Sequence, residues 1–131
     1  MDRAELLTEG RAFAEEGMVD ACVVEDRTGE TTDPFSGVVV GTYEQVYAGK
    51  CRFTQGIVDA QQVDVAEDQV LLQRVEVQLP VTATGIHVDA RVTVTAAGRD
   101  PDLVGRVFRV RHLMVRTDAT ARRLGVEEVT T

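Results

Sequence analysis

The clearest indication of the fold is the segment Ile86-His87-Val88-Asp89-Ala90-Arg91-Val92-Thr93-Val94. Its apolar and polar side chains alternate with a period of two, which is typical of an antiparallel strand with one buried face. The same alternation places Val75, Val77 and Leu79 on one face of the segment 69–79. We therefore expect strands over residues 69–79 and 86–95.

Further strands are expected on both sides of these two. Residues 18–26 predict a strand, and the glycines and proline of residues 27–37 predict a turn-rich segment after it. Residues 38–54 predict one or two strands with a kink or bulge at a glycine, Gly41 or Gly49. The last long strand is expected over residues 106–116, where a change of phase predicts a bulge near His112.

Two segments lack the period of a strand. Residues 55–68 are polar and acidic, and we expect them to form a long exposed loop. Residues 117–125 predict one capped helical turn that ends at Gly125, followed by a short extended piece over residues 126–129.

The N-terminal residues predict an amphipathic helix. Asp2 can cap a helix that runs to about Glu16, and Gly17 is placed to end it. Its apolar face would carry Leu6, Leu7, Gly10, Phe13 and Ala14. We expect this helix to pack on the surface of the domain, with a partner-binding helix as the alternative.

Together these elements predict a mainly β protein, a small antiparallel β-barrel of five to six strands. Closure into a barrel removes the strand edges that would otherwise aggregate. The 131 residues are expected to form a single domain, with the helix at 1–17, the barrel at 18–116 and a tail at 117–131.

The formal net charge of −8 argues against binding to nucleic acid or to an anionic membrane. The charge is uneven, because residues 1–68 carry −10 and residues 69–131 carry +2. This polarity suits head-to-tail self-association, although a well-solvated surface is the plain alternative. The N-terminus lacks the features of a signal peptide, and no stretch is apolar enough to cross a bilayer, so a reducing compartment is expected.

Residues that could carry chemistry are sparse. His87 and His112 lack acidic or thiol partners at ligand spacing, and Ser36 is the only serine. Cys22 and Cys51 show no CxxC spacing and are expected to be buried thiols. The sequence therefore predicts no catalytic residue, no metal site, no cofactor and no enzymatic activity.

Five short segments, spread over nearly the whole chain, share their order and spacing with a known group of proteins. They are Gly10-Arg11-Ala12 through Met18-Val19-Asp20 and Cys22; Val46-Tyr47-Ala48-Gly49-Lys50-Cys51-Arg52; Leu79-Pro80-Val81; residues 100–110; and Thr120-Ala121-Arg122-Arg123-Leu124. In these segments the chain resembles the head-to-tail connector (head-closure or stopper) proteins of long-tailed phages. It is most similar to an uncharacterised branch from phages of actinobacteria.

The resemblance implies a subunit of the phage neck, assembled in the host cytoplasm and located in the virion. Its expected partners are itself as a ring, the portal or adaptor on one side, and the tail terminator or tail tube on the other. Packaged DNA would occupy the channel and be repelled by carboxylates, and no membrane partner is expected. The acidic loop residues Asp59, Asp64, Glu67 and Asp68 are the candidates for facing that DNA.

Subunit or partner contacts are expected at Arg106, Arg122, Arg123, Glu127 and Glu128. Arg106 follows a proline-initiated turn at residues 100–105, where it could equally serve only as the start of a strand. Residues 126–129 could add a strand to a neighbouring sheet, with a frayed terminus as the alternative. Other functions that we consider are an adaptor or tail terminator of the same neck, and a small cytosolic ligand-binding barrel.

Overall fold

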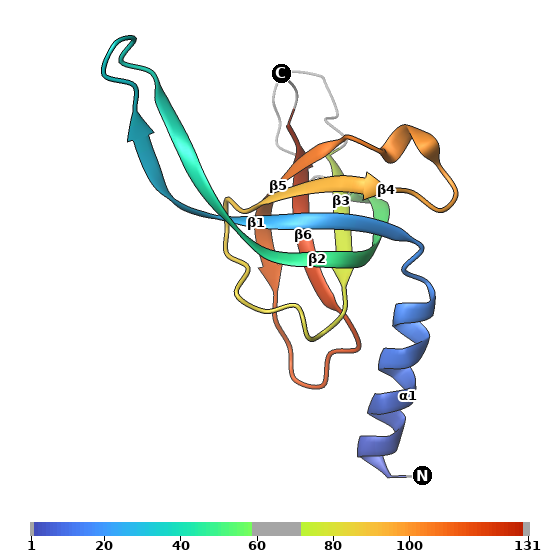
Figure 1. The fold of residues 1–131 in the computed structure, drawn as a ribbon. Coiled ribbons are helices and arrows are strands. Elements are labelled where there is room, and N and C mark those ends of the chain that lie inside the picture. The colour runs from blue at the N-terminus through green and yellow to red at the C-terminus, as the bar shows by residue number, and fades with distance from the viewer. Residues whose placement is uncertain (1, 59–71, 130–131) are drawn as a thin grey trace, which may run out of the picture.

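The computed structural model describes residues 2–58 and 72–129, and within them it contains six strands, one α-helix and one 3-10 turn. The elements are α1 (Arg3–Glu16), β1 (Asp20–Thr32), β2 (Val39–Val58), β3 (Leu72–Leu79), β4 (Arg91–Ala96), η1 (Pro101–Leu103), β5 (Val107–Met114) and β6 (Arg122–Glu128). All strand pairs are antiparallel, and they close into a barrel in the order β1-β2-β3-β6-β5-β4 (Figure 1). The expected small β-barrel is confirmed.

Inward-pointing aliphatic side chains fill the barrel. Alternate residues of each strand contribute to one core, which includes Cys22, Val24, Val77, Leu79, Val92, Val94, Val110 and Leu124. Phe108 stacks on Phe53 with ring centroids 5.2 Å apart. The interior is therefore a packed core of β-branched and leucine side chains, as an aromatic content of only 5% requires.

The strand expected over residues 86–95 is half right. Val92 and Val94 are buried in β4, but the strand begins only at Arg91. Asp89 has a φ of +75°, which interrupts an extended backbone. Ile86 and Ala90 are nevertheless buried in the connection before β4, whereas Val88, expected on the same face, is 50% exposed. The alternation therefore predicted the burial of four of these five apolar residues, but not the backbone conformation before Arg91.

The segment 27–37 is not a turn-rich loop. β1 continues to Thr32 and pairs with β2 as far as Val39, so the turn occupies only residues 33–38. The hydrogen bonds and side-chain contacts with the partner strand, which includes the β-branched residues Val39 and Val40, outweigh the turn preference of Gly29. The far part of this hairpin, residues 26–44, extends away from the barrel, and we call it the ribbon (Figure 1).

Residues 39–54 lie in one long strand, β2, but its irregularities are not at glycines. The register between β1 and β2 shifts at Val46 and at Thr28, each of which is an extra residue without a partner. These bulges lie where the ribbon leaves the barrel and increase the local twist. β2 continues to Val58, so residues 55–58 of the expected loop belong to a strand, and residues 59–68 lie outside the described residues.

The C-terminal helical turn expected at residues 117–125 is wrong. Residues 122–128 form β6, which lies between β3 and β5 and closes the barrel. Gly125 does not end a helix, because it faces the bulge near His112, where an added Cβ would lie 3.1 Å from the His112 Cβ. That bulge confirms the phase change predicted in β5.

The N-terminal helix has the expected ends. The Asp2 side chain accepts a hydrogen bond from the Glu5 backbone, the Glu5 side chain accepts one from Asp2, and Gly17 caps the C-terminus. The helix does not pack on the barrel, however. It extends from one end of the molecule, and its contacts reach mainly the β5–β6 connection, through Arg3 to Asp118 and Arg11 to the Ala119 carbonyl (Figure 1).

Candidate functional site

Three of the predicted interface residues lie together at one end of β5 and β6. The Arg106 guanidinium lies 3.4 Å from a carboxylate oxygen of Glu128, and Arg111 donates to Glu127 at 3.0 Å. All four side chains are on the outer face of the barrel and partly exposed. A charged surface is therefore formed by Arg106, Glu127 and Glu128. Their exposed ion pairs contribute little to stability, so these side chains are available to form ion pairs with another chain.

The other two predicted interface residues, Arg122 and Arg123, lie at the opposite end of β6, about 17–20 Å along the strand from Glu128. Arg122 donates to the backbone carbonyls of Ala83 at 3.1 Å and Val81 at 3.0 Å, so its guanidinium anchors the connection between β3 and β4. Arg123 is exposed, and its Nε lies 3.9 Å from Glu76. The interface role of these five residues stays a prediction, and the fold separates them into two groups.

The acidic residues expected to face DNA, Asp59, Asp64, Glu67 and Asp68, lie outside the described residues.

His87 has a partner that the sequence did not reveal. Its Nδ1 lies 2.8 Å from Oδ2 of Asp26, and its backbone N–H donates to Oδ1 of the same carboxylate at 3.3 Å. This contact joins the connection before β4 to the base of the ribbon. In the part of the chain that the structure describes, no group of three or more His, Cys, Asp or Glu side chains could hold a metal ion.

The two cysteines are free and buried, as expected. They project into the core from β1 and β2, and a hydrogen bond between the two thiols, followed by burial, raises the pKa of Cys51. A thiol with a raised pKa is a poor nucleophile, since the thiolate is the reactive form. Their place in the fold is structural.

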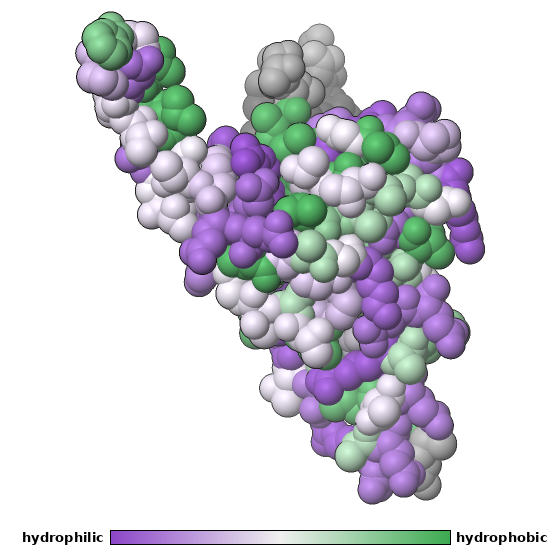
Figure 2. All heavy atoms as spheres, viewed as in Figure 1, coloured by the Kyte–Doolittle hydropathy of each residue, from purple (hydrophilic) through white to green (hydrophobic). Residues whose placement is uncertain are grey.

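Two elements that extend from the barrel carry apolar side chains without a cover. On the ribbon, Phe35 is 98% exposed and Val38, Val39 and Val40 are each 55% exposed. On α1, Phe13 is 79% exposed and Leu6 is 57% exposed. Figure 2 shows hydrophobic residues at the tip of the ribbon and along its length. Exposed apolar residues gathered on an extended element mark a surface for contact with another molecule.

Sequence reasoning missed this surface because it placed Phe35 in a turn-rich segment and assigned Val38, Val39 and Val40 to a strand without asking what covers them. The signal was present: three consecutive valines after a Pro-Phe-Ser-Gly turn lack the alternation of a half-buried strand. Such a run indicates that both faces of the strand are apolar. In the ranges 2–58 and 72–129 no sheet covers either face.

No helix among the described residues has the length and apolar character to cross a membrane.

Comparison with known proteins identifies the family. A family model matches residues 10–127, from the second half of α1 to the end of β6. The chain belongs to DUF6093, a family of unknown function. No curated protein matches this DUF6093 chain.

The fold of this DUF6093 chain is similar to that of a solved protein. The solution structure of protein SF1141 from Shigella flexneri 2a aligns with a TM-score of 0.53 at 17% sequence identity. The alignment covers 86% of this chain and 94% of SF1141. At this identity the similarity concerns the fold alone.

Proposed function

We propose that this DUF6093 chain is a structural subunit of a tailed-phage neck, a head-to-tail connector or stopper. It would form a ring between the portal or adaptor and the tail, and retain the packaged DNA. The observation that carries the proposal is the pair of extensions, the ribbon and α1, whose apolar side chains are uncovered. A barrel with two such extensions is built to hold neighbouring molecules.

Three further features support the proposal. The order and spacing of its sequence segments resemble the connector group. The net charge of −8 suits a channel wall that must not grip phosphates. A closed barrel supplies a rigid body, on which the extensions and loops can carry the contacts.

The competing functions have less support. A ligand-binding barrel needs an open apolar interior, whereas this barrel is filled by buried side chains. Adaptors of the group that the sequence resembles are mostly helical, whereas among the described residues this chain has one α-helix of 14 residues. A tail terminator, one layer away in the same neck, remains the nearest alternative.

Electron microscopy tests the proposal. The purified protein is examined alone and after mixing with capsids that carry the portal, and capsids without a portal serve as the control. We expect ring-shaped particles, or added density only at the portal vertex. A protein that stays monomeric and never joins portal-bearing capsids would contradict the proposal.

A further inference from the structure

The tip of the ribbon is a well-formed turn that presents Phe35. The Asp33 carboxylate accepts hydrogen bonds from the Phe35 backbone at 2.9 Å and from the Ser36 hydroxyl at 3.0 Å. Gly37, with a φ of +71°, lets the chain return, and the backbones of Asp33 and Val38 close the turn at 2.9 Å. Phe35 is therefore held fully exposed on an ordered turn.

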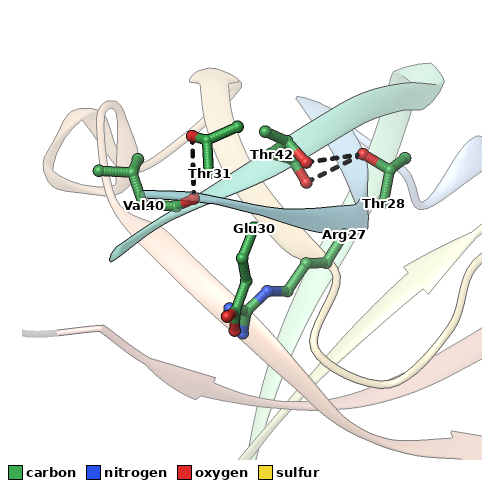
Figure 3. A network of polar contacts seen from close by, with 6 residues as sticks. All are labelled: Arg27, Thr28, Glu30, Thr31, Val40 and Thr42. Atoms are coloured by element: carbon green, nitrogen blue, oxygen red, sulfur yellow. Dashed lines mark hydrogen bonds and ion pairs between the residues drawn. The ribbon is translucent and has the colours of Figure 1, made fainter. Parts of the chain in front are cut away.

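Hydrogen bonds between the two strands stiffen the ribbon behind this turn (Figure 3). The Thr28 hydroxyl bonds to the Thr42 hydroxyl at 3.0 Å and to the Thr42 carbonyl at 3.2 Å. Thr31 donates to the Val40 carbonyl, and within β1 the Arg27 side chain pairs with Glu30. An isolated two-stranded ribbon is only marginally stable in water, so contact with another molecule would stabilise it.

The β5–β6 connection lies at the end of the barrel away from the ribbon tip (Figure 1). A surface pocket lies in this connection. We call it the β5–β6 pocket; its volume is about 200 Å³, and its walls include Met114, Val115, Ala119 and Ala121. Val115 is 79% exposed and Met114 is 44% exposed. An apolar cavity of roughly 150 Å³ already holds benzene, so the volume is sufficient for the side chain of Phe35.

The charges around the two surfaces are opposite. The ribbon carries four carboxylates, Asp26, Glu30, Asp33 and Glu44, against the single guanidinium of Arg27. The β5–β6 pocket includes Arg116 and Arg123. Among the described residues, Arg116 has no ion-pair partner within 4.0 Å. The hydrogen bonds from Phe35 and Ser36 lower the pKa of Asp33, so this carboxylate stays charged beside the exposed ring.

We propose that Phe35 at the ribbon tip of one subunit inserts into the β5–β6 pocket of a second copy of this chain, with Asp33 beside Arg116 and Arg123. Because the two surfaces lie at opposite ends of the molecule, the contact is head to tail and repeats from copy to copy. It is the subunit junction of the ring and rests on the function proposed above. Since one phenylalanine buries at most about 250 Å², the exposed valines of the ribbon must add to the interface.

Two single substitutions test the junction, one on each surface. Phe35→Ser removes the inserted ring and Val115→Asp places a charge in the pocket; both side chains are exposed, so the fold is expected to persist, which circular dichroism checks. We expect each variant alone to lose at least tenfold in self-association by sedimentation velocity. The matched control Phe13→Ser removes an exposed phenylalanine from α1 and should assemble like the wild type.

Mixing the two variants gives the decisive result. The Phe35→Ser subunit keeps an intact pocket and the Val115→Asp subunit keeps an intact tip, so each mixed pair can form one junction. The mixture should therefore form dimers and stop there. If the wild type assembles only on portal-bearing capsids, the expected result is loss of capsid occupancy in both variants and retention in Phe13→Ser.

Other results overturn the inference in distinguishable ways. If both variants assemble like the wild type, the junction is wrong while the proposed ring function stands. If both are monomeric but their mixture is also monomeric, the two surfaces do not meet. If rings persist but joining to the neck fails, the tip contacts another protein. If the wild type neither assembles nor joins capsids, the proposed function fails as well.

Discussion

Tyr47 is a partly buried side chain that contacts both the core and the backbone of its own strand. Its ring packs against the core, and its hydroxyl donates to the Lys50 carbonyl at 2.6 Å. Gly49 allows this approach, because an added Cβ would lie 2.9 Å from the Tyr47 hydroxyl oxygen. Burial, followed by the neighbouring Cys22, Cys51 and Glu15, raises the pKa of Tyr47 to about 12.

The raised pKa of Tyr47 predicts a pH dependence of stability. The unfolded tyrosine ionises near pH 10, whereas the folded one stays neutral until about pH 12. Its stabilising contribution is therefore complete below pH 10 and decreases as the pH rises towards 12. Compared with Tyr47→Phe, which costs about 1 kcal/mol below pH 10 through the lost hydrogen bond, the wild type should lose more stability in this range. Urea denaturation measures both proteins, and parallel pH profiles would contradict the assignment.

At the scale of elements, β6 and α1 differ in what they contribute to stability. β6 pairs with β3 on one side and with β5 on the other, and Leu124 in it is fully buried. α1 has no buried residue, and Leu6 in it is 57% exposed. The strand holds the barrel together, whereas the helix contributes no buried side chain to the core.

Two leucine truncations measure this difference. Leu124→Ala removes buried volume where the core cannot collapse fully, and we expect a loss of about 2–5 kcal/mol in the free energy of unfolding. Leu6→Ala, the matched control, should cost less than about 0.5 kcal/mol. Urea denaturation followed by circular dichroism gives both values. Equal effects of the two substitutions would show that β6 does not close the barrel.

On the scale of the whole molecule, the net charge and the two extensions support the proposed assembly and oppose binding to DNA. The formal net charge of −8 repels phosphates at long range, and three of the five arginines of β4 to β6, Arg91, Arg111 and Arg123, lie within 4.0 Å of a carboxylate. The ribbon and α1 extend from different ends of the barrel (Figure 1). The surface is thus suited to neighbours along a line or ring.

This charge distribution predicts that the protein does not bind duplex DNA at physiological salt. Fluorescence anisotropy with a labelled duplex should show no change up to concentrations at which basic proteins bind non-specifically, about 100 µM. Lowering the salt concentration should not create binding, because few cationic contacts are available to release counterions. Binding that strengthens steeply at low salt would mean that the paired arginines reach the phosphates.

The sequence predicted those elements well whose ends or irregularities depend on interactions between residues close together in the chain. Asp2, Glu5 and Gly17 define the helix through backbone hydrogen bonds within one turn. The change of phase near His112 predicted the bulge in β5, because a single extra residue moves later side chains to the other face. The expected helical turn failed at Gly125, since the glycine signal for a helix end is the same as that for a close approach between strands.

The alternation of apolar residues by itself determined that this chain forms a small β-barrel, because it fixes how many strand faces must be buried. Only the tertiary structure decided that residues 122–128 close the barrel and that the ribbon extends from it, since pairing depends on partners far away in the sequence. The exposure of Phe35 and the β5–β6 pocket belong to the same class. Both depend on which strands of the folded chain leave a surface uncovered, and the residues next to them in the sequence do not determine this.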